Sequence, residues 1–378
     1  MTLSILAPID PAPHYRAEPA EPGSRTMAQL RVEADKAHGF GKPFVAAVLE
    51  SLERVLPVVP SLLHMVEDWP GDLAPAGVIF RLNAGLHALA RSGRHPQLQR
   101  IYAAAGNGLV PDAAQLDLAI ALALAEGEAD LGGYIARPTQ TNEVGRIAGL
   151  AAVLMELNAR TVMPSEILEL GSSAGLNLNL DRYACNVFDT VAGNPRSRVR
   201  IAPRWTGRKM PSAPVPIAAT RGVDLHPLDV AKARHRERLH AYVWPCETAR
   251  DQRLSAAIAI ARRHPPRVDR GTATAWLDAQ LASPQRESVR RVVFHSMVVQ
   301  YMPEAERIAL RRTLARAGAA ATPQRPLVAV GLEWSGDRKA VELRVRQWNG
   351  GAHDGAAAIV AWCHPYAEWF DWIGLPDA

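Results

Sequence analysis

A glycine-bracketed turn after an acidic strand pattern carries the clearest chemical information in this sequence. Residues 166–170 read Glu-Ile-Leu-Glu-Leu and run directly into Gly-Ser-Ser-Ala-Gly at 171–175. A strand, a glycine-rich turn and then a helix is the arrangement by which Rossmann-like sheets hold a nucleotide-containing cofactor. Gly171 permits a tight turn, Gly175 lets the next helix approach the sheet, and Glu169 lies where a carboxylate can reach a ribose or a loop amide. These residue types therefore favour an enzyme that acts on a small molecule.

The same pentapeptide has two other interpretations, one chemical and one structural. It fits G-x-S-x-G, in which a serine nucleophile, here Ser173, lies on a strained turn between a strand and a helix. Two acid and histidine pairs occur in the order that such a serine hydrolase requires: Asp224 with His295, and Asp269 with His364. An α/β-hydrolase, however, places several strands before its nucleophile, whereas 166–170 is the first strand pattern here and no HGGG-type segment precedes it. The structural interpretation is a sharp turn of small residues without chemistry.

The composition is that of an ordinary globular protein and excludes several classes of function. The 378 residues are enough for two or three domains. Basic residues number 43 and acidic residues 38, a formal net charge of +5 without a long basic run, so we expect no binding to nucleic acid. The apolar run at 116–125 is too short to cross a bilayer, and the N-terminus has no signal-peptide pattern, so we expect no membrane segment.

The cysteines and histidines indicate the compartment and exclude a metal site. Cys185, Cys246 and Cys363 lie far apart, without a C-x-x-C pair. Their odd number fits a reducing compartment better than a disulfide framework, which predicts a cytoplasmic protein. The histidines are scattered without metal-ligand spacing, so we expect no metal.

The chain divides by composition into three parts. Residues 1–26 contain five prolines among small and charged residues, which predicts a flexible tail. Residues 27–160 show no convincing strand and predict a helical cap region, because apolar residues recur at helical spacing. Examples of this spacing are Phe44, Val45, Val48, Leu49, Leu52 and Val55. Residues 161–378 form the predicted α/β domain, which an arginine-rich insertion interrupts at about 184–216.

Strand and helix patterns alternate after the glycine turn. Strand patterns occur at 220–225, 291–296 and 327–333, and helical patterns at about 228–242, 247–262 and 303–317. Such alternation implies a parallel sheet with helices between its strands. The last part differs, because apolar residues alternate with charged ones at 341–346 and a second apolar run at 357–362 follows two glycines. These two runs predict an antiparallel hairpin.

Six segments carry a resemblance to known families. They are 140–146 (Gln-Thr-Asn-Glu-Val-Gly-Arg), 169–177, 181–183 (Asp-Arg-Tyr), 222–229 (Gly-Val-Asp-Leu-His-Pro-Leu-Asp), 244–245 (Trp-Pro) and 295–301 (His-Ser-Met-Val-Val-Gln-Tyr). The whole chain resembles the bacterial family known as domain of unknown function 2332, and its part from about 166 to 372 resembles a class I S-adenosylmethionine-dependent methyltransferase domain. The resemblance implies an α/β fold with a Rossmann-like sheet of the class I methyltransferase type and a helical N-terminal region.

The resemblance also implies where S-adenosylmethionine binds. Glu169 and the following glycines would receive the amino-acid part of the cofactor. Asp224, at the end of the second strand, would receive both ribose hydroxyls, because a carboxylate can accept two hydrogen bonds from a vicinal diol. The other cofactor-binding positions that the resemblance implies are Gly171, Ser172, Ser173, Gly175, Asn177, Thr272 and Ser296. Asp224 has a second interpretation, as a cap of the helix that follows His226-Pro227.

Three departures from the methyltransferase pattern bear on cofactor binding. Ser173 stands where a glycine normally allows close approach of the backbone. About fifty residues separate the turn from Asp224, against about twenty in a simple nucleotide-binding unit, so the insertion must lie between them. Thr272 stands where an aspartate often meets the adenine amine.

Four further residues are candidates for catalysis on the acceptor side. His295 ends the predicted fourth strand, where donor and acceptor meet in this fold, and can act as a general base near neutral pH; Tyr301 follows it. Glu143 and Arg146 open a predicted helix before the first strand and can bind the methionine carboxylate or the substrate. Alternatively, His295 is satisfied by backbone contacts, and Glu143 and Arg146 form an N-cap and an i,i+3 ion pair. The arginines of the insertion favour an anionic substrate.

Four hypotheses of function follow from these residues. The first is an S-adenosylmethionine-dependent methyltransferase that acts on a small molecule. The second keeps the fold without the cofactor, and the protein binds another small molecule or transforms it by acid-base cyclisation or elimination. The third is a non-catalytic partner subunit that associates through its helical region, and the fourth is the serine hydrolase. An oligomer or a protein partner is compatible with each.

Overall fold

The computed structural model describes residues 24–351 and 353–376, which divide into two compact units. The helical unit contains the described residues up to Thr141 together with Glu237–Asp251, and the sheet unit contains Asn142–Arg236 and the residues from Gln252 onward. The first boundary between the units therefore lies at Thr141, whereas the sequence pattern predicted it at residue 160. A later segment, Glu237–Asp251, also belongs to the helical unit. Residues 1–23 of the expected tail lie outside the described residues.

The helical unit is built from short helices around one apolar core. Its helices are α1 (Arg25–Gly39), α2 (Pro43–Val55), η1 (Leu56–Val58), α3 (Pro60–Glu67), α4 (Leu73–Ala76), α5 (Val78–Arg91), α6 (Pro96–Ala105), α7 (Ala113–Glu126) and α8 (Glu128–Ile135). Leu52, Leu82 and Leu86 are fully buried in the core, as the helical spacing of apolar residues predicts. Proline at the first helical position opens α2, α3 and α6. No strand occurs in the described residues before position 161, which confirms that prediction.

The sheet unit contains a nine-stranded, mostly parallel sheet with the order β5-β12-β11-β10-β9-β8-β1-β6-β7. The strands are β1 (Ser165–Leu170), β5 (Arg204–Gly207), β6 (Ile217–Asp224), β7 (Val268–Arg270), β8 (Arg290–Ser296), β9 (Leu327–Trp334), β10 (Val341–Trp348), β11 (Ala357–Cys363) and β12 (Trp369–Trp372). The five strands from β7 to β9 run parallel, and β9 to β12 pair antiparallel. The chain thus has a mixed α/β fold.

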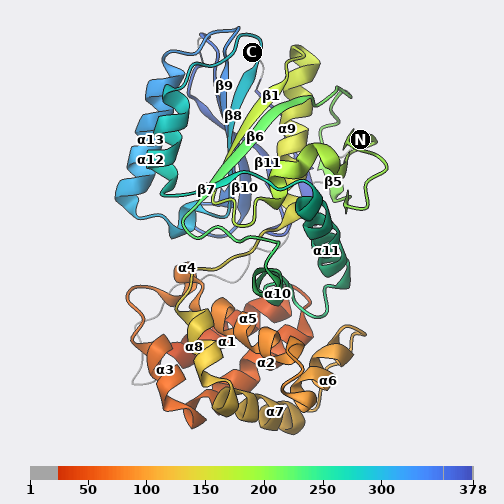
Figure 1. The fold of residues 1–378 in the computed structure, drawn as a ribbon, viewed down its shortest axis with the longest axis vertical. Helices are drawn as coiled ribbons and strands as arrows, with labels where there is room; N and C mark the ends of the chain where they lie inside the picture. Colours follow the sequence, from red (N-terminus) through yellow and green to blue (C-terminus); the bar gives the residue numbers. More distant parts are fainter. Residues whose placement is uncertain (1–23, 352, 377–378) are drawn as a thin grey trace, which may run out of the picture. The chain divides into compact units, whose positions relative to one another are not determined.

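Helices cover both faces of this sheet, as Figure 1 shows. On one face lie α12 (Ala273–Ala282) and α13 (Glu304–Gly318), and on the other lies α9 (Ile147–Arg160). Leu168 and Val293 of the sheet pack in one apolar cluster with Leu277 of α12 and Leu310 of α13. The chain between β6 and β7 contains α10 (Ala233–Ala241) and α11 (Thr248–Arg263), and its residues Glu237–Asp251 belong to the helical unit. Because both faces are covered, the central strands read as continuous apolar runs.

The strand order reverses at β1, and this reversal positions the candidate site. After β1 the chain first adds β6 and β7 on one side and then β8 and β9 on the other. The register pairs Glu169 with Gly222 of β6, and Leu170 with His295 of β8. In open α/β sheets, ligands bind outside the carboxyl ends of the strands at such a switch point. The residues that follow β1, β6 and β8 are therefore the ones to examine.

Most sheet elements agree with the sequence patterns, and the differences are local. Six predicted strands are confirmed as β1, β6, β8, β9, β10 and β11. The predicted hairpin is part of a longer antiparallel run from β9 to β12. The insertion forms a second sheet from β2 (Ala184–Val187), β3 (Thr190–Gly193) and β4 (Arg200–Ile201), with the order β3-β2-β4. Between residues 24 and 376, leaving out 352, no helix has the length and apolar character needed to cross a membrane.

Candidate functional site

The turn after β1 needs its two glycines because of both backbone conformation and packing. Gly171, Ser173 and Gly175 have φ values of +68°, +54° and +69°, in the left-handed region that favours glycine. A Cβ on Gly171 would lie 2.3 Å from Cγ2 of Val298, and one on Gly175 would lie 2.6 Å from Cγ2 of Val268. Side chains of the protein itself therefore occupy the space beside both glycines.

Asp224 at the end of β6 is bonded to this turn. Its Oδ2 accepts a hydrogen bond of 2.8 Å from the main-chain N–H of Ser173, and its Oδ1 accepts one of 2.8 Å from the N–H of His226. On the other side of the turn, Asn142 Oδ1 accepts the N–H of Leu176 at 3.0 Å. The turn, the end of β6 and the segment before α9 thus form one bonded group at the switch point. The expected helix cap after His226-Pro227 is wrong, because the next helix, α10, begins only at Ala233. The bond to His226 closes a local turn, and the bond to Ser173 joins the end of β6 to the turn after β1.

Glu169 is a buried carboxyl with an incomplete set of partners. It is 2% exposed, and its Oε1 accepts a hydrogen bond of 2.9 Å from Nδ2 of Asn177. Its Oε2 is buried and has no hydrogen-bond partner among the described residues, because the hydroxyl of Ser172 donates to the main-chain oxygen of Glu169. Burial raises the pKa of Glu169 to about 7 against the opposing hydrogen bond of Asn177, and the charge of Asp224 adds to the rise. The carboxyl is therefore partly neutral near pH 7.

His295 at the end of β8 is held by a glutamate at the end of β9. Its Nδ1 lies 2.7 Å from Oε1 of Glu333, and the same oxygen accepts the main-chain N–H groups of Val298 at 3.1 Å and Val299 at 3.4 Å. The ring lies beside Gly331, where a Cβ would come within 2.5 Å of the imidazole Cε1. The alternative interpretation is that backbone groups satisfy His295. At Nδ1 its partner is instead a carboxylate.

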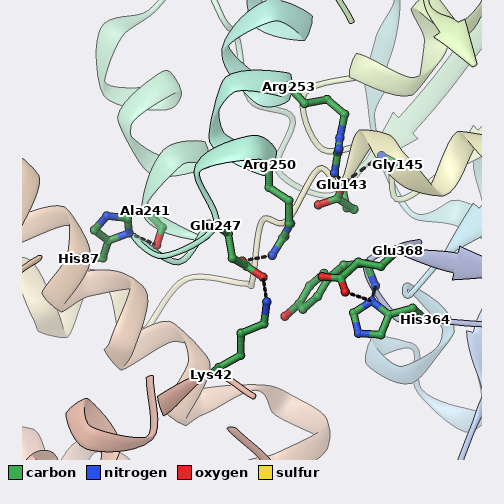
Figure 2. Close-up of polar contacts among 11 residues, drawn as sticks. Lys42, His87, Glu143, Gly145, Ala241, Glu247, Arg250, Arg253, His364 and Glu368 are labelled. Atoms are coloured by element: carbon green, nitrogen blue, oxygen red, sulfur yellow. Dashed lines mark hydrogen bonds and ion pairs between the residues drawn. The ribbon is translucent and has the colours of Figure 1, made fainter. Parts of the chain in front are cut away.

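Glu143 and Arg146 are both buried just before α9, and each is bonded to a group elsewhere in the sheet unit. Glu143 accepts the N–H of Gly145 at 2.9 Å and pairs with Arg253 of α11 at 3.1 Å (Figure 2). Arg146 Nε donates to the main-chain oxygen of Pro365 at 2.9 Å. Glu143 thus acts as the N-cap of a 3-10 turn, η2 (Val144–Arg146), in agreement with the structural interpretation of this residue.

The other predicted site residues lie at strand ends or on the surface. Ser296 is the half-buried last residue of β8, and Thr272 is exposed at the N-cap position of α12, where its side chain makes no cap hydrogen bond. Tyr301 is 42% exposed in the 3-10 turn η4 (Val299–Tyr301). Asn177 is buried in η3 (Leu176–Arg182). The structure therefore brings Glu169, the turn, Asn177 and Asp224 together by direct bonds, and leaves Thr272 and Tyr301 outside this set.

The arginine-rich insertion and the hydrolase pairs have other partners in the structure. β5 is an edge strand, and five strands separate it from β1. Arg208 pairs with the buried Glu156 of α9. Of the carboxyl and histidine groups nominated for Ser173, Asp269 is bonded to Arg221 and Trp276, and His295 to Glu333.

Comparison with known families agrees with the resemblance of the whole chain. A family model described as "uncharacterized protein conserved in bacteria (DUF2332)" matches residues 27–372. The chain belongs to this family. No curated protein and no solved structure matches the chain.

Glu333 of this DUF2332 protein was not among the residues predicted from the sequence, although the sequence contains a signal for it. The strand pattern at 327–333 ends in an acidic residue, and the patterns at 166–170 and 220–225 likewise carry Glu169 and Asp224 next to their last residue. Val298, whose side chain lies against Gly171, is a further neighbour of the turn that no local pattern indicated. Among residues 24–351 and 353–376, no group of three or more His, Cys, Asp and Glu side chains is placed to hold a metal ion.

Proposed function

We propose that this protein binds S-adenosylmethionine at the carboxyl ends of β1 and β6 and transfers its methyl group to a small molecule. The observation that carries the proposal is the 2.8 Å bond between the N–H of Ser173 and Asp224. It joins the glycine turn after β1 to the acidic end of β6 at the point where the strand order reverses. A nucleotide ligand in an α/β sheet is held by this combination of a turn and an acidic strand end.

Two features of the site fit the parts of this cofactor. The oxygens of Asp224 accept the main-chain N–H groups of Ser173 and His226, and a carboxylate is the acceptor type that suits the two hydroxyls of a ribose. Glu169 Oε2 is a buried acceptor without a partner among the described residues. A cationic group such as the amino group or sulfonium of the cofactor would stabilise this carboxylate in its ionised form. The residues therefore fit the ribose and the charged amino-acid part.

The strand order supports the proposal further. The parallel series β7-β6-β1-β8-β9 is followed by antiparallel strands, as in the methyltransferase-type sheet that the sequence resembles. One difference is that β10 follows β9 directly as a hairpin, without a helix between them. The difference lies on the far side of β9 from the switch point and leaves the turn after β1 unchanged.

The residues of the chain have separate tasks under this proposal. When bound, the cofactor supplies an electrophilic methyl group on a sulfonium sulfur. Asp224 would orient the ribose by accepting hydrogen bonds from its hydroxyls, and Glu169 would balance positive charge beside the turn. His295 lies at the level of Leu170 in the sheet, next to the turn, and can accept a proton from the acceptor.

A specific observation favours a second candidate function, a methyltransferase-type fold that works without the cofactor. The space beside Gly171 and Gly175 is filled by Val298, Val268 and Pro266, and the N–H of Ser173 is bonded to Asp224 instead of pointing to a ligand. In this case the acid-base groups at the same edge, above all His295, act on another small molecule.

Isothermal titration calorimetry with S-adenosylmethionine and S-adenosylhomocysteine distinguishes the two. Under the first proposal the wild-type protein binds both, and Asp224→Ala loses the binding while its circular dichroism and melting temperature show a folded protein. Asp181→Asn, an exposed carboxyl of the sheet unit, is the matched control for the loss of one charge and should bind as the wild type does. Absence of binding to folded wild-type protein contradicts the first proposal and favours the second. Equal binding by Asp224→Ala contradicts the role of Asp224.

A further inference from the structure

The pair formed by His295 and Glu333 specifies which nitrogen of the imidazole carries the proton. A carboxylate can only accept hydrogen bonds, so the 2.7 Å contact with Glu333 requires a proton on Nδ1 of His295. In the neutral ring the other nitrogen, Nε2, then holds a lone pair. No hydrogen bond joins Nε2 to another residue within 24–351 and 353–376. A histidine in this state can act as a base, because its Nε2 can accept a proton.

The position of this pair connects it with the glycine turn. His295 pairs with Leu170 in the register of β8 and β1, one residue before Gly171. The oxygen that holds His295 also accepts the N–H of Val298, whose side chain lies against Gly171. Glu333 therefore fixes both the imidazole and the chain segment that borders the turn.

Two further features keep the ring in this orientation. Gly331 on β9 lies directly opposite His295 in the register, and any larger residue would collide with the ring. The segment after β8 is held from the other side, because Arg338 of the β9–β10 loop donates to Oε1 of Gln300 at 3.2 Å. The imidazole is thus confined between a glycine and a bonded turn, which lowers the cost of orienting it for proton transfer.

We propose that Glu333 is the positioning residue of His295, and that Nε2 of His295 takes a proton from a hydroxyl or N–H group of the substrate. In this step the bond between the hydrogen and the substrate oxygen or nitrogen breaks and its electron pair remains on that atom. A new N–H bond forms at Nε2, and the positive charge of the imidazolium is balanced by Glu333. The proton later leaves to solvent. The substrate class is therefore one whose reacting atom carries a proton, such as an alcohol, a phenol or an N–H heterocycle.

The role of His295 as a base in methyl transfer rests on the proposed function. The position of the proton on the imidazole does not rest on that function, because it can be measured without any ligand. Long-range proton–nitrogen NMR of protein labelled with nitrogen-15 in its histidines distinguishes a proton on Nδ1 from one on Nε2. The His295 signals are assigned by their loss in His295→Gln, at a pH where the ring is neutral.

We expect the wild-type protein to carry the proton on Nδ1, and Glu333→Leu to move it to Nε2. Glu333→Gln keeps an acceptor oxygen at the same place and should retain the Nδ1 proton, which separates positioning from a purely structural role. His240 of the helical unit, whose Nδ1 lies 2.6 Å from Oδ1 of Asp251, is an internal control whose signals should not change. A wild-type His295 with its proton on Nε2, or one that keeps its state in folded Glu333→Leu, overturns the proposal.

The same variants separate this inference from the proposed function. If calorimetry shows no binding of S-adenosylmethionine but the Nδ1 proton is found and depends on Glu333, the methyltransferase proposal fails and the base remains. If the cofactor binds but the proton lies on Nε2, the inference fails and the proposed function remains.

Discussion

Replacing Glu169 by glutamine should make the protein more stable above pH 7 and leave its stability nearly unchanged below about pH 4.5. Burial raises the pKa of this carboxyl from 4.5 to about 7 in the folded protein. Below 4.5 the folded and unfolded states both hold the proton, so the group has no effect. Above 7 both states are ionised, and the folded state alone bears the cost of a buried charge. The wild-type protein therefore loses stability as the pH rises from about 4.5 to about 7.

The size of this loss follows from the pKa shift. One pKa unit corresponds to about 1.4 kcal/mol, so a rise from 4.5 to about 7 gives about 3 kcal/mol. Glutamine is a neutral analogue of the protonated acid, and its carbonyl oxygen can still accept the hydrogen bond from Asn177. The free energy of unfolding of Glu169→Gln minus that of the wild type should thus grow from near zero at pH 4 to about 3 kcal/mol at pH 8.

Urea unfolding at several pH values, followed by tryptophan fluorescence, measures this difference. Only Trp69 and Trp244 lie in the helical unit and the other tryptophans lie in the sheet unit, so fluorescence reports mainly on the unit that contains Glu169. Two transitions are fitted where two are seen, because two units need not unfold together. Asp181→Asn again controls for the lost charge. A Glu169→Gln variant that is less stable than the wild type at pH 8, or a difference that stays constant between pH 4 and 8, would refute the reasoning.

Two further substitutions test the packing of the site and the buried charges of the helical unit. Gly171→Ala should lower the free energy of unfolding by about 1–3 kcal/mol, because its Cβ would meet Val298 at 2.3 Å in a left-handed backbone. Urea unfolding should show that the double variant with Val298→Ala recovers part of this lost stability. A Gly171→Ala variant as stable as the wild type would contradict the packing argument. Glu247→Ala should cost about 2–3 kcal/mol, because it removes a carboxylate that pairs with the buried Arg250 and lies 3.1 Å from Nζ of Lys42 (Figure 2). In the same assay Glu53→Ala, which removes a more exposed partner of Arg31, should cost less than about 1 kcal/mol, and equal costs would contradict the role of burial.

The central strands could be predicted from sequence because burial on both faces leaves a continuous apolar pattern. β1, β8 and β9 show this pattern, and each has an ionisable side chain near its carboxyl end. β7 has only three residues, half-buried or exposed, so no periodicity distinguishes it from a loop. β12 carries two tryptophans in a four-residue strand, which is also too short for a pattern.

The helical unit shows why its boundary could not be read from the sequence. Residues 237–251 belong to it although nearly a hundred residues of the sheet unit come first. Trp244 packs against the apolar core of the unit, and the main-chain oxygen of Ala241 bonds with His87 at 3.2 Å. Such contacts join residues distant in sequence, and local propensity contains no information about them.

The candidate site was predictable where its residues are adjacent in sequence. Glu169, Ser173 and Gly175 lie within seven positions of one another, so the turn could be recognised directly. The partners of the predicted residues could not, because the pairing of His295 with Glu333 and of Glu143 with Arg253 depends on the register of strands and on helix packing. Sequence thus identified the groups that can react, and the fold determines what holds them.

Binding of S-adenosylmethionine to the wild-type protein can be measured by titration calorimetry at pH 7, in two buffers with different enthalpies of ionisation. We expect saturable binding with release of a fraction of a proton, because a cationic ligand beside Glu169 ionises a carboxyl whose pKa is about 7 in the free protein. Folded protein that gives no heat of binding, confirmed by equilibrium dialysis, would contradict it.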